Sequence, residues 1–315
     1  MPTPLPALEG VYLVIPVHNR REITLGCLEC LATAGVLAWA TAIVVDDGST
    51  DGTAAAIRER FPEVVVLDGD GNLWWTGGIV MGMREAMQRG ASVIIWLNDD
   101  CRPRPGTMKS LVRNTLETGA ISVGQTIAEA GGSYTGWTKT IWDLKSVICP
   151  PGEQMPCDTF PGNCVAMPRR VVEEIGYPDD ANFPHAFADA DYGFRAQARG
   201  FKSFVLGDAL CDNIDLLNQQ SLSWLLDHRP ARQLLPSLFA RTSSMNPKAF
   251  WSYHTRYWGI FGAIRFTLTY VKLGLSIVVK SVLPRKLLIR AFGRRSLAWQ
   301  AQEAYDRVRF ENTNK

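Results

Sequence analysis

Three clusters of acidic side chains could serve different parts of one reaction. In chain order they are Asp46-Asp47, Asn98-Asp99-Asp100 and Asp189-Ala190-Asp191. Carboxylate oxygens accept hydrogen bonds from hydroxyl groups, bind Mg²⁺ or Mn²⁺, and act as general bases. The clusters could therefore bind a hydroxylated ligand, hold a divalent metal or remove a proton.

The first two clusters each follow a short apolar run that is typical of a buried strand. Such runs occur at residues 11–16, 42–45, 64–67 and 92–97, and they alternate with helical patterns near 23–34, 54–61 and 78–88. This alternation predicts a mainly parallel sheet covered by helices on both faces. Because ligands of such sheets bind at the carboxyl ends of the strands, we expect a nucleotide-type site beside the polar clusters.

Several other protein classes lack support in the sequence. No GxGxxG fingerprint follows the first strand and no GxxxxGK[ST] loop occurs anywhere, which argues against dinucleotide and P-loop enzymes. Cys27 and Cys30 have no second CxxC pair to complete a zinc site, so we interpret them as helix packing. The first ten residues show no basic and apolar export signal, and the expectation is a cytoplasmic protein with reduced thiols.

The alternation breaks down after residue 120. Residues 131–137 and 162–167 have the pattern of antiparallel strands, and a helix is expected at 169–175. A second helix is expected to open at Asp189 or Asp191 and to run to Arg199, before a last strand at 202–207. These elements would form the half of the domain that faces the second substrate.

The motifs, taken in order, resemble glycosyltransferase family 2 with the GT-A fold. They read VIPVHNR at 14–20, IVVDDGSTDGT at 43–53, LNDD at 97–100 and ADADYGFR at 188–195. The stretch GNLWWTGGIVMGMREA at 71–86 is similar to that of the subgroup that contains rhamnosyltransferases. The resemblance covers roughly residues 10–215 and implies an inverting enzyme that uses a nucleotide-diphosphate sugar.

The resemblance assigns donor-binding roles to the residues after the first strands. Asp47 would accept hydrogen bonds from the ribose or the base, and Pro16, His18 and Asn19 would line the base pocket. Asp51 is interpreted instead as a turn and helix-capping residue.

The glycine-rich stretch is expected to contact the donor. Gly71, Gly77 and Gly78 would let the backbone approach the donor closely, and Asn72 could hydrogen-bond to it. Trp75, like its neighbour Trp74, suits either the protein core or stacking on a sugar, and the sequence does not choose between these roles.

Asn98-Asp99-Asp100 occupies the position of the family's DxD motif. The resemblance makes Asp100 the ligand of a divalent metal, Mg²⁺ or Mn²⁺, and places Asn98 and Asp99 beside the donor. Such a metal neutralises charge on a pyrophosphate leaving group. Asn98 departs from the family pattern, because it replaces the first Asp of the motif.

Asp189 maps to the family's catalytic base, which takes the proton of the acceptor hydroxyl. Ala188 stands where the family usually has Glu. Asp191 is interpreted as the N-cap of the following helix before a second base. Asn163, His185 and Asp191 are candidates for acceptor or phosphate contacts, although a structural role is the simpler interpretation of His185.

The C-terminal region has a charge of opposite sign to the rest of the chain. Residues 228–315 contain sixteen basic and three acidic residues, whereas residues 1–227 contain seventeen basic and twenty-eight acidic ones. We therefore expect a catalytic domain at 1–227, with its donor half at about 10–120 and its acceptor half at about 121–215, and a basic helical appendage at 228–315. This asymmetry suggests an anionic partner for the appendage.

The anionic partner is expected to be a membrane. Residues 259–283 form a long apolar stretch in which Arg265, Lys272 and Lys280 fall within roughly an 80° arc of a helix. Such a helix lies in a membrane interface more readily than it crosses the bilayer. With the further basic residues up to 295, it predicts peripheral attachment to the cytoplasmic leaflet, although packing on the catalytic domain is an alternative. Nucleic acid is a poor fit because so much of the stretch is apolar.

The sequence thus predicts a hexosyltransferase that acts in surface polysaccharide biosynthesis. Its donor would be a nucleotide-diphosphate sugar carrying rhamnose or a similar hexose, and its acceptor a glycan, expected to be lipid-linked. The alternatives are a nucleotidyltransferase, which PVHNRR disfavours because it lacks glycines, and a non-catalytic nucleotide- or glycan-binding protein, which Asn98 and Ala188 suggest.

Overall fold

The computed structural model describes residues 9–128, 133–214 and 231–292. The chain divides into two compact units, residues 1–214 and 215–315, and each is described by itself. The domain boundary that the sequence predicts, between residues 227 and 228, lies outside the described residues.

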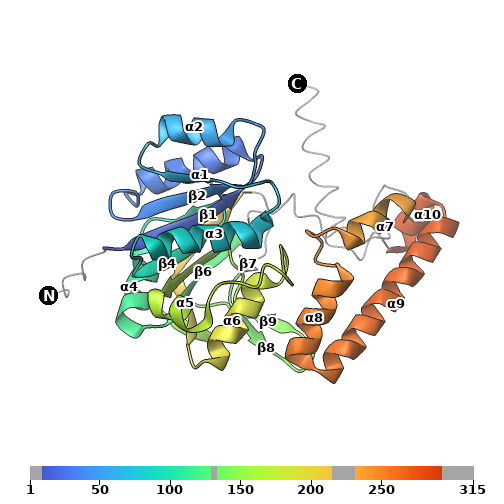
Figure 1. Ribbon diagram of the computed structural model, residues 1–315. Helices are drawn as coiled ribbons and strands as arrows, with labels where there is room; N and C mark the ends of the chain where they lie inside the picture. The colour runs from blue at the N-terminus through green and yellow to red at the C-terminus, as the bar shows by residue number, and fades with distance from the viewer. Residues whose placement is uncertain (1–8, 129–132, 215–230, 293–315) are drawn as a thin grey trace. The chain divides into compact units, whose positions relative to one another are not determined.

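The N-terminal unit is built on a mixed sheet whose first half is parallel (Figure 1). Its strand order is β3-β2-β1-β4, with β1 at Val11–Val17, β2 at Thr41–Asp46, β3 at Val65–Asp68 and β4 at Val93–Leu97. All three contacts between these strands are parallel. The almost continuous burial of β1, β2 and β4 explains why each of these strands is apolar along its length.

The sheet continues from β4 through strands that come later in the chain. β11 (Cys164–Pro168) pairs antiparallel with both β4 and β6 (Ile121–Ala128), and β12 (Ser203–Asn213) runs parallel to β6. Short strands complete the edges: β10 (Gln154–Cys157) and β5 (Cys101–Pro103) pair with β12, and β7 (Ser133–Tyr134) pairs with β6. β8 (Trp137–Lys139) and β9 (Leu144–Ser146) form a separate hairpin.

Helices cover both faces of the sheet and enclose two hydrophobic cores. One core joins the sheet to α1 (Arg21–Thr33), α2 (Thr53–Arg60) and α4 (Thr107–Thr118). The other joins it to α3 (Trp74–Gln88), α5 (Arg169–Ile175) and α6 (Ala188–Ala198). Successive residues of β1 point to opposite cores, since Leu13 and Ile15 belong to the first and Val14 to the second.

The predicted elements are present, with differences at their ends. The four parallel strands, the helix at 169–175 and the antiparallel strand near 162–167 are confirmed. The elements that were not predicted include α4, β6 and the short strands β5, β9 and β10. β6 escapes recognition because it buries Ser122, Gln125 and Thr126, and Gln125 exchanges two hydrogen bonds with the backbone of Cys149.

The C-terminal unit is helical over its described residues. It contains α7 (Ala231–Phe239), α8 (Pro247–Trp258), α9 (Ile260–Val282) and α10 (Arg285–Phe292). α8 and α9 pack through aromatic rings, among them Trp251 edge-on to Phe266 with centroids 5.0 Å apart. Gly262 permits the tight turn between the two helices, because a Cβ there would lie 2.0 Å from the carbonyl oxygen of His254.

Candidate active site

The polar clusters lie at one edge of the sheet, as the parallel order requires. Val17 at the end of β1 is in register with Asp46, and Asp46 is in register with Asp68. Asn98 directly follows β4, which pairs with the other side of β1. The carboxyl ends of β1, β2 and β4 therefore deliver their loops to one place, which is where ligands bind in sheets of this kind.

Asp47 anchors the glycine-rich loop. Its carboxylate accepts hydrogen bonds from the backbone N–H groups of Gly71 (2.8 Å), Leu73 (3.1 Å) and Trp74 (2.8 Å). These N–H groups precede or open α3 and have no helical partner of their own. The protein thus occupies three acceptor positions of the carboxylate. Only the remaining lone pairs of Asp47 are available for the predicted contact with the donor.

His18 and Asn19 form the neighbouring loop after β1. His18 Nδ1 lies 2.6 Å from the carbonyl oxygen of Asp47, and Asn19 receives a hydrogen bond from the backbone N–H of Thr50. Asn19 adopts a positive φ of 51°, and both side chains are exposed. The two residues contact the Asp46–Asp51 turn, and their role in a base pocket, with that of the half-buried Pro16, stays a prediction.

Gly77 and Gly78 are not exposed to a ligand, which corrects the expectation that they let the donor approach closely. Both are buried inside α3, which begins four residues earlier than predicted. A Cβ at Gly78 would lie 2.9 Å from Cβ of Pro16, and one at Gly77 would lie 3.1 Å from Cβ of Leu73. Their small size serves the packing of α3. Gly71 has a φ of 84°, and Asn72 is exposed at the loop, so these two keep their predicted access.

Trp75 connects the donor side of the site to the acceptor side. Its Nε1 donates a hydrogen bond to Oδ1 of Asn98 (2.8 Å), and its ring packs edge-on against the buried Trp96. Its other neighbour is Gly162, where a Cβ would come within 2.3 Å of the ring. The half-buried ring thus belongs partly to the core. Asn163 is half-buried beside it, and its carbonyl oxygen accepts the N–H of Asn98.

Asp189 lies next to this pair, at the start of α6. Its carboxylate is half-buried and accepts hydrogen bonds from the backbone N–H groups of Gly162 and Ala190, both at 2.8 Å. Burial raises the pKa of Asp189, and these two hydrogen bonds oppose the rise in part. A carboxylate with a raised pKa is a stronger base than an exposed one, which suits proton removal.

The prediction that Asp191 caps α6 is wrong. The helix begins at Ala188 and its N-cap position is Phe187, which has a φ of 72°. Asp191 has no exposed surface and pairs with Arg195 one turn later (2.9 Å), while Arg195 also holds the carbonyl groups of Ile175 and Tyr177. The predicted contact of Asp191 with an acceptor or a phosphate is therefore wrong, because its carboxylate is enclosed and paired with Arg195, which is itself held by two backbone carbonyls. His185 is exposed on the preceding loop.

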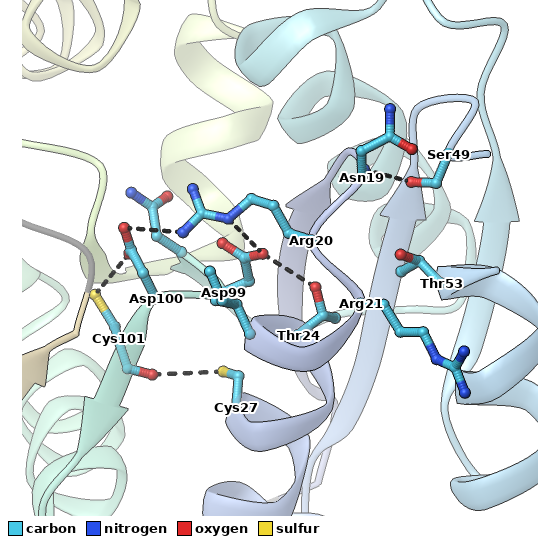
Figure 2. A network of polar contacts seen from close by, with 12 residues as sticks. Asn19, Arg20, Arg21, Thr24, Cys27, Ser49, Thr53, Asp99, Asp100 and Cys101 are labelled. Carbon is cyan, nitrogen blue, oxygen red and sulfur yellow. Dashed lines mark hydrogen bonds and ion pairs between the residues drawn. The ribbon is translucent and has the colours of Figure 1, made fainter. Parts of the chain in front are cut away.

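Asp99 and Asp100 form a buried acidic pair that shares one cation. Asp99 is 4% exposed and Asp100 is 2% exposed. Arg20 Nε lies 3.2 Å from Asp99 Oδ2, and Arg20 Nη2 lies 3.5 Å from Asp100 Oδ2 (Figure 2). Thr24 donates a further hydrogen bond to Asp99 (3.0 Å). Burial raises the pKa of Asp99 to about 6, and Arg20 opposes this rise.

Arg20 is a site residue that the sequence pattern did not identify. It closes the VIPVHNR motif, and its position directly after a strand that ends at the site was the available signal. Its partners follow β4, however, and which loop a long side chain meets across a sheet edge is decided only by the fold.

The acidic pair fits a divalent metal that is shared with a substrate. Over the residues that the structure describes, no group of three or more His, Cys, Asp or Glu side chains is placed to hold a metal ion. Asp99 and Asp100 nevertheless offer carboxylate oxygens, which Mg²⁺ and Mn²⁺ prefer, and Mg²⁺ usually takes further ligands from phosphates and water. Two carboxylates alone leave most positions around such a metal to water or to a ligand.

Comparison with solved structures identifies the class of fold. The structure is similar to the crystal structure of GalNAc-T7 with UDP, GalNAc and Mn²⁺, with a TM-score of 0.55 and 16% sequence identity over 65% of this chain and 43% of that chain. It is also similar to the mannosyltransferase PcManGT from Pyrobaculum calidifontis in complex with GDP-Man and Mn²⁺, with a TM-score of 0.49 and 14% identity over 93% of this chain and 82% of that one. The N-terminal unit has the GT-A fold of nucleotide-sugar transferases, as predicted.

The family follows from the sequence. Residues 12–176 match the model of glycosyl transferase family 2. The chain belongs to this family, whose members are glycosyltransferases. No curated protein matches the sequence. The chain spans less than half of GalNAc-T7, so that protein's own substrates do not transfer to it.

Proposed function

We propose that the protein transfers a sugar from a nucleotide-diphosphate donor to a hydroxyl group of a glycan, with inversion at the anomeric carbon. Membership of glycosyl transferase family 2 supports the class of reaction. The observation that carries the proposal is the connection from the carboxylate of Asp189 through Gly162 and Trp75 to Asn98, beside the acidic pair. A candidate base and a candidate metal-binding pair are thus held close together by packed residues.

Asp189 is the proposed base. As the acceptor hydroxyl attacks the anomeric carbon, its proton passes to the Asp189 carboxylate, and the bond from the sugar to the diphosphate breaks. The backbone hydrogen bonds from Gly162 and Ala190 orient the carboxylate during this transfer. Trp75 lies against Gly162, and its ring is proposed to give the sugar an apolar surface.

Asp100, with Asp99 beside it, is proposed to hold the divalent metal. When bound there, a divalent metal would supply positive charge to offset the negative charge of a departing nucleoside diphosphate. Support comes from the oxygen donors of the pair and from their place at the end of β4. The GalNAc-T7 structure, which shares the fold, contains UDP and Mn²⁺.

The donor sugar is proposed to be rhamnose or a similar hexose, and the acceptor a lipid-linked glycan of a surface polysaccharide. The resemblance of residues 71–86 to the rhamnosyltransferase subgroup supports the sugar. Support for a lipid-linked acceptor comes from the C-terminal unit, which has the features of a membrane-binding element.

The experiment is donor hydrolysis by the purified protein against a panel of nucleotide sugars, with Mn²⁺, with Mg²⁺ and with EDTA. We expect one donor to release nucleoside diphosphate in the presence of metal, and Asp189→Asn to lower the rate of this release by roughly 10²- to 10⁴-fold, the usual contribution of a general base. Asp212→Asn is the matched control, because Asp212 is a half-exposed carboxylate paired with Arg104.

The opposite outcome has a defined meaning. If no donor is turned over, with lipid-linked glycan supplied as acceptor, the protein is a nucleotide- or glycan-binding member of the family. Two observations favour this second candidate. The side-chain oxygen of Asn98 accepts a hydrogen bond from Trp75. Ala188 is fully buried at the position where the family resemblance implies Glu.

The second part of the proposal is peripheral attachment to the cytoplasmic face of a membrane through α9. By length and composition α9 is able to cross a membrane, and only 11% of its most apolar stretch is buried, unlike a core helix. Apart from Phe261, the large exposed apolar residues of α9 form one stripe, which we call the α9 stripe: Ile260, Ile264, Leu268, Val271, Leu275, Val278 and Val282. At 3.6 residues per turn these positions lie within roughly an 80° arc.

The charges beside the α9 stripe support a lipid surface as its partner. Arg265, Lys272 and Lys280 lie to one side of the stripe, as in helices that rest in an anionic interface. The spacing of the stripe would also suit a coiled coil between two copies, but pairing would bring like charges together. A helix with basic residues on one flank and an apolar face 23 residues long therefore fits lipid better than a second copy.

Flotation with liposomes that contain anionic lipid tests this attachment. We expect the protein to float with the liposomes at physiological salt and to be released by alkaline carbonate, as a peripheral protein is. Retention after carbonate would indicate a spanning helix, and absence of flotation would indicate that α9 packs on protein.

A further inference from the structure

One guanidinium group holds two adjacent buried carboxylates at the candidate metal site. Arg20 contacts Asp99 through Nε and Asp100 through Nη2, and both contacts are made to the Oδ2 atoms (Figure 2). Two like charges on neighbouring buried residues repel each other, so a cation beside them is needed for both to ionise. The Arg20 side chain is 31% exposed, so one side of it faces solvent into which it can move.

A divalent metal would compete with Arg20 for the carboxylate of Asp100. The proposed metal ligand is Asp100, and the Oδ2 atom of its carboxylate already faces the guanidinium. Two cations within a few ångströms of each other in a buried site repel strongly. Full occupancy of Asp100 by a metal therefore requires that Arg20 move away from it.

We propose that Arg20 is an internal counter-ion that occupies the metal position of Asp100 in the donor-free protein and is displaced when the metal binds. It retains its second contact, with Asp99, which Thr24 holds in place from α1. The proposal uses the assignment of Asp100 as the metal ligand and thus rests on the proposed function, but it concerns binding alone.

Displacement makes metal affinity depend on the donor. Without a diphosphate, the metal has to replace a charge-assisted pair and leave a guanidinium without that partner, so it binds weakly. A diphosphate brings negative charge that pairs with both cations, because guanidinium groups bind phosphate through paired N–H donors. Arg20 therefore acts as a positioning residue that couples metal binding to donor binding.

The test is a titration of the full-length, donor-free protein with Mn²⁺, in which the electron paramagnetic resonance signal of free Mn²⁺ is followed. We expect Arg20→Met to bind Mn²⁺ roughly fivefold or more tightly than the wild type, the low end of coupling between two ligands of one site. Arg20→Lys keeps the charge and should stay near the wild-type affinity. Adding Asp100→Asn to Arg20→Met should abolish the gain.

A merely structural role of Arg20 predicts the opposite direction. If Arg20 only orders the loop, its removal misplaces Asp100, and Arg20→Met binds Mn²⁺ more weakly or equally well; either result overturns the proposal. A gain that survives Asp100→Asn also overturns it. Arg104→Met, which breaks the half-exposed pair with Asp212, is the matched control.

Two controls distinguish the counter-ion role from misfolding and from failure of the enzymatic proposal. Circular dichroism and thermal melting check each variant, and Arg20→Gln replaces Arg20→Met if the latter does not fold. Because Mn²⁺ binding is measured without turnover, tighter binding by Arg20→Met together with failure of every donor would leave the counter-ion role standing and remove only the enzymatic proposal.

Discussion

Asp99 and Asp189 show how burial gives two carboxylates of one site different tasks. Burial raises the pKa of both. The Asp189 carboxylate accepts hydrogen bonds from two neutral backbone N–H groups, so its proton affinity is available for chemistry. Asp99 faces Arg20 and Thr24, which fix it in place. The raised pKa of Asp99 should therefore make the free energy of unfolding depend on pH.

Asp99 should make the metal-free protein less stable as the pH rises. Its folded pKa, about 6, is above the usual value of 3.8. The folded state thus binds this proton more tightly than the unfolded chain, so the stabilising contribution is complete below about pH 4 and is lost as the pH rises through about 6. In EDTA, Asp99→Asn should remove up to about 3 kcal/mol of this decline in the free energy of unfolding.

Urea denaturation at pH values from about 4 to about 7.5 measures this decline, because the window spans the unfolded and folded pKa of the carboxyl group. Asp212→Asn serves as the control, because its carboxylate is half-exposed. If the slopes of wild type and Asp99→Asn coincide, Asp99 does not carry the pH dependence.

Asp189 should give sugar transfer an acidic limb at a higher pH than an exposed carboxylate would. Only the deprotonated carboxylate can accept the proton, so kcat/KM should fall as the pH falls through the raised pKa of Asp189. A pH profile of kcat/KM on the active donor measures it. A rate that does not change down to about pH 4, near the ordinary pKa of a carboxyl group, would contradict the assignment of Asp189 as the base.

At the scale of elements, α3 is the piece that joins sheet packing to the site. Asp47 holds the loop before it, Trp75 in its first turn reaches Asn98, and Gly82, about two turns later, lets the helix approach β1. A Cβ at Gly82 would lie 2.3 Å from Cγ1 of Val14. The position of Trp75 therefore depends on contacts made deep in the core.

Gly82→Ala should destabilise the protein by about 1–3 kcal/mol, the usual cost of overpacking a core. It should also lower activity, because α3 carries Trp75 with it when it shifts from the sheet. Gly274→Ala is the matched control: Gly274 lies within α9, and a Cβ there would meet no atom within 4 Å, so alanine should be neutral or slightly stabilising. Denaturant titration compares the two; equal effects would contradict the packing argument.

At the scale of the whole molecule, charge divides the chain into an acidic part and a basic part. Residues 228–315 carry a net charge of +13 and residues 1–227 one of −11, so an overall charge of +2 conceals two opposite fields. In the proposed membrane attachment, an anionic surface would attract the basic part and repel the acidic part. The catalytic unit would thus act beside the membrane without being embedded in it.

The apolar and basic parts of α9 should contribute to liposome binding in different ways. Lys272→Gln with Lys280→Gln should weaken binding by about 2 kcal/mol, roughly 30-fold, at low salt and much less at high salt, because each charge near anionic lipid adds about 1 kcal/mol and salt screens it. Leu268→Gln with Leu275→Gln should weaken binding at every salt concentration, since apolar burial is not screened. Flotation across a salt series measures both, and identical salt dependence of the two double variants would contradict this division.

The sequence by itself determined the class of fold and the edge of the sheet on which the site lies. Apolar strands that alternate with helices admit few arrangements, and polar residues after β1, β2 and β4 must then meet at one edge. The order of motifs was enough to indicate the family. Each strand and the polar residues that follow it are contiguous in the chain, so a local sequence pattern is enough to predict them.

The tertiary structure alone decided which partner each side chain uses. Asp47 holds Gly71 to Trp74, Asp191 is buried on Arg195 instead of capping α6, and Arg20 spans Asp99 and Asp100 from a different strand. The contacts of Asp47 and Arg20 join loops whose orientation follows from packing, and the Asp191–Arg195 pair lies within α6, whose first residue only the fold revealed. A carboxylate looks the same in a sequence whether it faces a substrate, a helix N-terminus or an arginine, and only the packed fold distinguishes these environments.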